Sequence, residues 1–255
     1  MNPPATSIVV RTFNEGRRLR RVLQKLYGQT FRDFELIIVD NSSTDETLAV
    51  IRDLPVAKLV SIPSEKFGHG FSLNLGVFAA SANLVVLTNG HCVPCSEYWL
   101  EAGLDNFREA PVAAVTGNYS ASSDGSIWER LYDLRQIRTL YLRQENLPIT
   151  TTNAIIRRDL WLEYQFDEDL PQCEDYDWSR EMIARGFKTV KDPRFNVYHS
   201  HGLSLSAIRS RERQWKTISA ALDSKERPST CQSIVFRKGL EDLGIVLQRP
   251  TRGKA

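Results

Sequence analysis

Hydrophobic positions along the first half of the chain follow two alternating patterns. Short apolar runs typical of buried strands occupy residues 7–11, 35–40, 58–61, 83–88 and 113–117. Segments whose apolar residues recur every three to four positions, as on one face of a helix, occupy residues 15–27, 45–54, 70–80 and 97–107. Strands that alternate with helices favour parallel pairing through right-handed crossovers. The pattern predicts an α/β fold, with a Rossmann-like, mostly parallel central sheet flanked by helices.

The second half is less regular. Helices are predicted at 127–143, 174–185 and 204–222, and short strands lie within 150–158 and at 188–191 and 196–199. No linker rich in Gly, Ser or Pro separates the halves, so residues 1–255 are interpreted as a single domain. Its parts are a first half at about 7–117, a second half at about 118–222, and a polar, basic tail at 223–255.

Composition excludes several classes of protein. Of 255 residues, 42% are hydrophobic and 25% charged, and the net charge of +2 is too small for the basic footprint of a nucleic-acid-binding protein. No run approaches the roughly 18 apolar residues of a membrane span, and the first residues lack a signal region, so we expect a cytoplasmic protein. Cys92 and Cys95 form a single CxxC without a second pair, which favours small buried side chains over a zinc site.

Polar residues follow each predicted strand of the first half. In open parallel sheets, ligands bind outside the carboxyl ends of the strands. The residues at those ends are 12–15 (TFNE), 40–43 (DNSS), 64–70 and 89–91 (NGH). The first of these turns lacks GxGxxG, and the chain contains no P-loop. A polar ligand site is therefore expected, without either familiar phosphate-binding loop.

Five motifs, in order, resemble those of glycosyltransferase family 2, whose members are inverting nucleotide-sugar transferases of the GT-A fold. The motifs are VVRTFNE at 9–15, IIVDNSSTD at 37–45, Asn74-Leu75-Gly76 followed by Ala79-Ala80, the acidic pair Glu174-Asp175, and a late histidine, His199, in VYH. Each motif alone is weak. The resemblance runs from about residue 7 to about residue 202 and rests on all five occurring at suitable spacing.

One departure from the family concerns the metal. The family usually ends its fourth strand with Asp-x-Asp, which holds Mg²⁺ or Mn²⁺ against the donor diphosphate; here Asn89-Gly90-His91 stands at that place. The hypothesis is a divalent metal ion, Mn²⁺ or Mg²⁺, with His91, His199 and Asn89 as ligands. Mn²⁺ tolerates a nitrogen ligand better than Mg²⁺ does. The alternative is a site without metal, in which His91 and basic groups hold the diphosphate.

The resemblance also implies roles for individual residues. Asp175 is the expected catalytic base, Glu174 orients the acceptor or shares that role, and Asp177 lies close enough to compete. The residues expected to bind the nucleotide or donor sugar are Thr12, Asn14, Glu15, Asp40, Asn41, Lys66, His69, Asn74, Asn89, His91 and Asn153. Simpler interpretations stay open: Asn14 and Glu15 could cap a helix, Asp40 could close a turn, and the acidic pair could favour a helix N-terminus.

The function implied by the resemblance is transfer of a sugar from a nucleoside-diphosphate sugar, with UDP favoured, to an acceptor hydroxyl with inversion. The acceptor would be a sugar, a glycolipid or a small molecule, in the biosynthesis of polysaccharides or other glycoconjugates. A non-catalytic nucleotide-binding scaffold and a nucleotidyltransferase are the alternatives. The basic run from Arg17 to Lys25 is most simply a solvated helix face, and a weaker interpretation is peripheral contact with the inner face of a membrane.

Overall fold

A central sheet organises the molecule in the computed structural model, which describes residues 3–108, 111–140, 142–224, 243 and 245–248. Among these residues the strand order is β12-β3-β2-β1-β4-β9-β6-β10-β8. The bounds are β1 (Thr6–Thr12), β2 (Phe34–Asp40), β3 (Lys58–Ser61), β4 (Leu84–Asn89), β6 (Val112–Thr116), β8 (Gln144–Glu145), β9 (Asn153–Arg157), β10 (Lys188–Lys191) and β12 (Val246–Gln248). A small second sheet joins β5 (Val93–Pro94), β11 (Val197–Tyr198) and β7 (Tyr119–Ser120).

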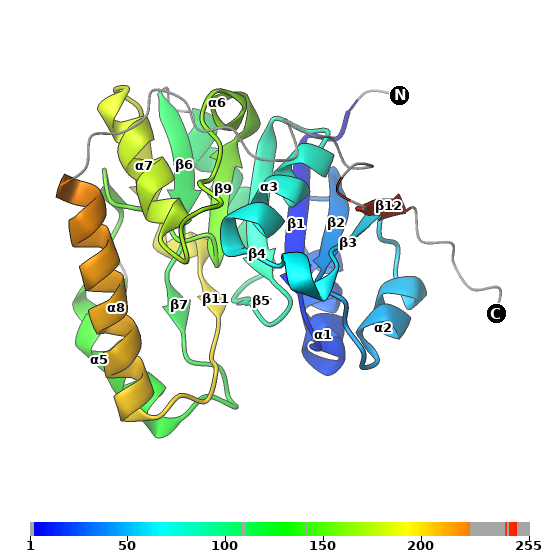
Figure 1. Cartoon of the computed structure of the whole chain (residues 1–255), viewed down its shortest axis with the longest axis horizontal. Helices are drawn as coiled ribbons and strands as arrows, with labels where there is room; N and C mark the ends of the chain where they lie inside the picture. Colours follow the sequence, from blue (N-terminus) through cyan, green and yellow to red (C-terminus); the bar gives the residue numbers. More distant parts are fainter. Residues whose placement is uncertain (1–2, 109–110, 141, 225–242, 244, 249–255) are drawn as a thin grey trace.

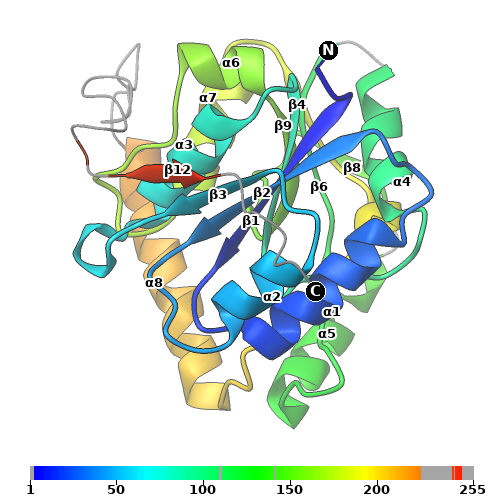
Figure 2. The same cartoon turned by 90° about the vertical axis from the view of Figure 1, so that its right-hand side faces the viewer.

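Helices cover both faces of the large sheet (Figures 1 and 2). Their bounds are α1 (Gly16–Tyr27), α2 (Thr47–Asp53), α3 (His69–Ala79), α4 (Trp99–Asp105), α5 (Ile127–Leu140), α6 (Arg158–Glu163), α7 (Glu174–Ala184) and α8 (Leu205–Ser224). Short 3₁₀ turns occupy Ser64–Lys66, Asn106–Arg108 and Pro193–Phe195. The helices predicted from periodicity are all present, and α6 is an addition. No helix in the described part of the chain has the length and apolar character of a membrane span.

Two hydrophobic clusters lie on opposite faces of the sheet. Side chains of successive strand residues point to opposite faces, so Val9 joins one cluster and Val10 the other. The first cluster includes Trp161 and Trp178 from α6 and α7, and the second includes Trp99 from α4. This burial on both faces explains why the strand sequences are apolar throughout rather than alternating.

The sheet is mostly parallel, as predicted, and β10 also pairs in parallel with β6; β9 is the main exception among the described strands. β3, β2, β1 and β4 pair in parallel, as expected. β9 is antiparallel to both β4 and β6, which places the start of β9 at the same edge as the ends of its neighbours. The carboxyl ends of β1, β2 and β4 meet at this edge, where Arg11 pairs in register with Asn89, and Thr12 with Asp40.

The C-terminal segment is not simply the polar tail that its composition predicts. β12 pairs antiparallel with β3 and extends the sheet at its edge (Figure 2). Leu243 and Ile245 are buried in the first hydrophobic cluster, because apolar residues interrupt the polar sequence here. The structure does not describe residues 225–242, which include Cys231.

Candidate active site

A cavity of about 980 Å³ lies along the carboxyl edge of the sheet. The turns after β1, β2 and β4 contribute to its lining, and so do α3, the start of α7, the loop after β11, and the facing sides of α5 and α8. The structure brings nine of the predicted site residues to this cavity: Thr12, Glu15, Asn41, His69, Asn89, His91, Glu174, Asp175 and His199. Residues far apart in sequence therefore share one polar site.

Three predicted site residues are held inside turns or the core instead. Asn14 has a positive φ of 51° and accepts a hydrogen bond from the Thr44 N–H at 2.8 Å, which ties two loops together. Asp40 is buried and accepts from the Ser43 N–H and hydroxyl. Asn74 is fully buried, donates to the Phe166 carbonyl and accepts from the Trp161 indole. The polar partners of these side chains come from the protein, and none of the three lines the cavity.

Two further predicted residues also lie away from the cavity. Asn153 is fully buried at the start of β9, and its amide donates to the Phe195 carbonyl. Lys66 donates from Nζ to the Leu243 carbonyl at 2.6 Å, so its ammonium group holds the C-terminal segment. Neither residue lines the cavity, although Asn153 Oδ1 is buried without a hydrogen-bond partner among the described residues.

Asp175 lies in the first turn of α7 and faces the cavity. The Thr151 N–H donates to its Oδ2 at 3.0 Å. Burial, and then the neighbouring charge of Glu174, raise the pKa of Asp175 to about 6. Burial also raises the pKa of Glu174. A carboxylate whose pKa lies near neutrality is suited to accept a proton from a hydroxyl group.

Asp177 does not compete for this role. It is buried and accepts a hydrogen bond at 2.8 Å from the Tyr164 hydroxyl, away from the cavity lining. The acidic first turn of α7 thus combines two functions: Asp177 packs the helix against the core, while Glu174 and Asp175 face the site. Acidic groups at this position also interact favourably with the helix dipole. Cys173 precedes them with a φ of +72°, a conformation that is uncommon for a residue with a Cβ atom.

Arg11 is a site residue that the sequence reasoning missed. It is the penultimate residue of β1 and donates from Nη2 to Asn89 Oδ1 at 3.1 Å, with longer contacts at 3.4 Å to the Ser72 hydroxyl and the His69 carbonyl. Its Nε is buried without a partner among the described residues. Burial lowers its pKa, and the nearby Glu174 and Asp175 oppose that shift. A cation therefore occupies the position between the acidic pair and the strand end where the family usually places Asp-x-Asp.

Three histidines form a cluster at the other side of the strand end. A ring nitrogen of each of His91, His199 and His201 lies within 4.8 Å of one from each of the others. Burial, and then His91, lower the pKa of His199 to about 3, and burial with His91 lowers that of His201 to about 4. Both rings are thus neutral at pH 7, the form that binds a metal. Tyr119 packs edge-on against His199.

The cluster fits a divalent transition metal ion. His91 Nε2 is buried and has no partner among the described residues, while Nδ1 of the same ring contacts Glu15 Oε1. A carboxylate on the far nitrogen fixes the tautomer that leaves Nε2 free to bind a metal. His201 completes the set. Asn89 is the poorer candidate ligand, since its Oδ1 already accepts from Arg11.

Gly90 allows this arrangement. A Cβ atom at position 90 would lie 2.5 Å from Glu15 Oε2 and 2.8 Å from Thr12 Oγ1. Thr12 in turn donates to Glu15 Oε2 at 3.3 Å. The glycine between Asn89 and His91 therefore provides the space in which Glu15 reaches the histidine ring.

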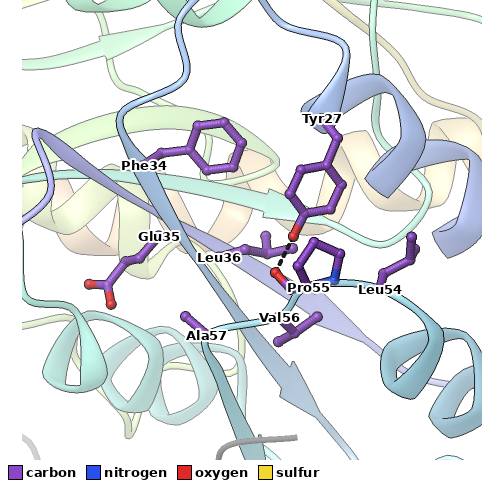
Figure 3. Close-up of a pocket in the computed structure, with 8 residues that line it drawn as sticks. All are labelled: Tyr27, Phe34, Glu35, Leu36, Leu54, Pro55, Val56 and Ala57. Carbon is purple, nitrogen blue, oxygen red and sulfur yellow. Dashed lines mark hydrogen bonds between the residues drawn. The ribbon is translucent and has the colours of Figure 1, made fainter. Parts of the chain in front are cut away.

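Features outside this cavity carry little chemistry. A hollow of about 360 Å³ lies at the amino end of β2, where the Tyr27 hydroxyl donates to the Pro55 carbonyl (Figure 3). Its one carboxylate, Glu35, is already bonded to Ser7, Ser81 and Lys58. Cys92 is buried, and burial raises the pKa of its thiol to about 12, which opposes formation of a reactive thiolate.

The chain matches the family model "Glycosyl transferase family 2" over residues 7–164, more than half of its length. The chain belongs to this family. It is 23% identical over 192 residues to glycosyltransferase AglE of Haloferax volcanii, covering 72% of this chain and 63% of the relative. The match therefore spans less than two thirds of that relative.

Two further comparisons bear on ligands and fold. A dolichyl N-acetyl-alpha-D-glucosaminyl phosphate 3-beta-D-2,3-diacetamido-2,3-dideoxy-beta-D-glucuronosyltransferase of Methanococcus voltae is 22% identical over 217 residues, covering 76% of this chain and 66% of the relative. A mannosyltransferase of Pyrobaculum calidifontis, solved in complex with GDP-Man and Mn²⁺, superposes with a TM-score of 0.65 at 19% identity, covering 95% of this chain and 69% of that one. The fold is GT-A, as the resemblance implied.

Proposed function

We propose that this protein transfers a sugar from a nucleoside-diphosphate sugar to an acceptor hydroxyl, with inversion at the anomeric carbon. The observation that carries the proposal is Asp175, a carboxylate with a raised pKa that is held by the Thr151 N–H and lines the same cavity as the turns after β1 and β4. A base on the acceptor side and polar turns on the donor side are what a direct displacement requires.

Asp175 would take the proton from the attacking hydroxyl oxygen as that oxygen bonds to the anomeric carbon. The bond from that carbon to the diphosphate oxygen breaks in the same displacement, and the nucleoside diphosphate leaves. Arg11 is suited to donate charge-assisted hydrogen bonds to this leaving group, because its Nε has no partner among the described residues. Glu174, next to the base, would orient the acceptor.

The base of the donor would bind beside Asn41. This side chain lines the cavity, and its Oδ1 is buried without a donor in the described part of the chain. A uracil imide N–H would satisfy it, which keeps UDP as the proposed nucleotide. Phe13 and Phe67, exposed on the same cavity, provide apolar surface for a planar ring.

His91, His199 and His201 would hold the divalent metal ion, with Glu15 orienting His91. When bound, such an ion supplies positive charge to the diphosphate. Three imidazoles favour Mn²⁺ or Zn²⁺ over Mg²⁺, which prefers oxygen ligands. The mannosyltransferase structure with Mn²⁺ supports a divalent ion at a fold of this kind.

The acceptor is proposed to be a sugar of a glycolipid, as the name of the dolichyl-phosphate-dependent relative suggests. Arg211 and Lys216 of α8 line the cavity and offer positive charge to a lipid phosphate or diphosphate. Such acceptors belong to the biosynthesis of polysaccharides and other glycoconjugates.

Asp175→Asn tests the central claim. Nucleotide binding is measured by calorimetry with UDP, GDP and dTDP, each with and without Mn²⁺, and turnover by release of nucleoside diphosphate. The variant should bind UDP like the wild type and lose turnover by about 10²–10⁴-fold, the usual contribution of a general base. Asp177→Asn is the matched control for a nearby acid. The proposal would be overturned if Asp175→Asn kept wild-type turnover. It would also be overturned if the wild-type protein bound UDP but showed no turnover across a panel of donors and acceptors.

A further inference from the structure

Over residues 127–134, helix α5 presents its polar side to the protein and its apolar side to solvent. Ile127, Trp128, Leu131 and Leu134 are 65, 43, 47 and 59% exposed. At 100° per residue, Ile127, Leu131 and Leu134 fall on one narrow stripe, and Trp128 lies at its margin. This order is the reverse of that in an ordinary surface helix, whose apolar stripe faces the core.

The polar side of α5 is fixed by specific contacts. Glu129 accepts hydrogen bonds from the N–H groups of Ser126, His201 and Gly202, and Asp133 accepts from the Ala121 N–H. Tyr132 and Asp133 line the cavity. These contacts determine the rotation of the helix about its axis. The outward apolar stripe is therefore a defined surface and not the result of a helix free to turn.

Exposed basic side chains lie on α5 and on the elements next to it. Arg130 is exposed on α5 itself, and α8, which contacts α5, exposes Arg209 and Arg213. Arg18 of α1 pairs with Asp124 at 2.9 Å, immediately before α5, and so brings the exposed arginines of α1 next to this region. No ion pair within the described ranges holds Arg209 or Arg213.

We infer that the outer face of α5, with the basic residues of α8 and α1 around it, docks onto a lipid bilayer that carries anionic headgroups. Leucine and isoleucine on a helix that lies in the interface, tryptophan at its margin and arginines around it are the combination that binds such a surface. A second copy of the chain would need acidic groups facing these arginines, whereas the acidic residues of α5 in the described region face inward. The inference rests on the surface alone and does not depend on the proposed reaction.

Docking would leave only α5 between the membrane and the cavity, because opposite sides of this helix supply the lipid-facing stripe and part of the cavity lining. The distance that an acceptor sugar on a membrane lipid has to span to reach the cavity would then be short. The basic run of α1 differs from α5 in this respect. The apolar residues of α1 between its charged residues are buried, so α1 offers no exposed apolar surface to a membrane.

Vesicle binding of the full chain tests the inference. In cosedimentation experiments, the wild-type protein should bind vesicles of phosphatidylcholine and phosphatidylglycerol. A far smaller fraction of the protein should bind vesicles of pure phosphatidylcholine. Leu131→Glu with Leu134→Glu should reduce the partition coefficient by about tenfold or more, since two leucines leave the interface. Leu162→Glu, at a leucine 44% exposed on α6, is the matched control and should bind like the wild type. Circular dichroism and UDP titration would establish that each variant is folded.

Charge provides a second, independent variant. Arg209→Gln with Arg213→Gln should weaken binding to the anionic vesicles by about fivefold for each charge removed, and added salt should remove the difference. Absence of wild-type binding to anionic vesicles would overturn the inference. An equal loss of vesicle binding in the Leu162→Glu control would also overturn the inference. So would a concentration-dependent dimer that Leu131→Glu dissociates without any effect on vesicle binding.

Discussion

Arg11 donates a hydrogen bond at 3.1 Å to Asn89 across the paired ends of β1 and β4. The pair replaces an arrangement in which a carboxylate at the end of the fourth strand faces a metal ion. A carboxylate at position 89 would bind the arginine directly and neutralise it. With asparagine there, the guanidinium keeps its charge and interacts with Glu174 and Asp175 instead. The loss of Asp-x-Asp and the presence of Arg11 are thus parts of one rearrangement.

Replacing Arg11 should therefore affect both sides of the site. Arg11→Gln removes the charge that lowers the pKa of Asp175, so the acid limb of the kcat/KM profile should move to higher pH. UDP affinity should also fall by about tenfold, the effect of losing charge-assisted hydrogen bonds to phosphate. Arg18→Gln, at an exposed arginine, is the control. An unchanged pH profile together with unchanged UDP affinity would remove Arg11 from the site.

The pH dependence of turnover reports the coupling between the two acids of α7. A base with a pKa near 6 is protonated below that pH, so kcat/KM should fall about tenfold per unit below pH 6. In the wild type, the negative charge of Glu174 raises the pKa of Asp175. Glu174→Gln removes this charge, so the acid limb of the kcat/KM profile should move to lower pH. An acid limb that moves to higher pH in Glu174→Gln would contradict the coupling between Glu174 and Asp175.

The same buried charge affects stability. The folded-state pKa of Asp175 lies above its ordinary value of 3.8, so the ionised carboxylate destabilises the fold, and the effect grows as the pH rises from about 4 to above 6. Asp175→Asn should raise Tm by about 2–4 °C at pH 7.5, equivalent to roughly 1 kcal/mol, and should have little effect at pH 4. Asp177→Asn should instead lower Tm, because the Tyr164 hydroxyl loses a charged partner. A Tm of Asp175→Asn that falls at pH 7.5 would show that the carboxylate stabilises the fold.

Sequence reasoning succeeded where local pattern decides the structure and failed where distant residues decide it. The strands at β1 and β2 follow from their apolar runs, and α7 from its spacing. The direction of β9 could not be predicted, because a buried strand such as Ala154–Ile156 has the same composition whether its neighbours run parallel or antiparallel. The extension of the sheet by β12 was hidden by the polar composition around a few apolar residues.

The candidate site shows the same division. Asn74 and Asn153 were assigned to the donor because the family resemblance implied it, whereas in the structure their side-chain amides donate to backbone carbonyls of residues distant in sequence. Arg11 was overlooked because it stands inside a motif whose other positions match the family. Its position beside Asn89 could have been found only from the register of two strands that are 78 residues apart.

The histidine cluster predicts a metal preference that separates this chain from enzymes with Asp-x-Asp. Calorimetric titration with Mn²⁺, Zn²⁺ and Mg²⁺ in the presence of UDP should show the weakest binding for Mg²⁺, because the ligands are three imidazole nitrogens. His201→Ala should weaken binding of Mn²⁺ and Zn²⁺. His69→Ala is the matched control, since His69 lines the same cavity outside the cluster. Equal affinity for Mg²⁺ and Zn²⁺, or equal losses in the two variants, would argue that oxygen ligands from elsewhere hold the metal.

In the proposed metal site, Glu15 would act on the metal through the ring of His91, which gives a test of the geometry behind the cluster. Glu15→Gln should weaken metal binding by about 10–100-fold, the range found for partners that orient a metal-binding histidine. Gly90→Ala should have a similar effect without changing any ligand, because the added methyl would displace the Glu15 carboxylate. Gly68→Ala is the control, since a Cβ at position 68 meets only the Phe71 side chain at 3.5 Å. Wild-type metal affinity in Gly90→Ala would show that Glu15 does not set the orientation of His91.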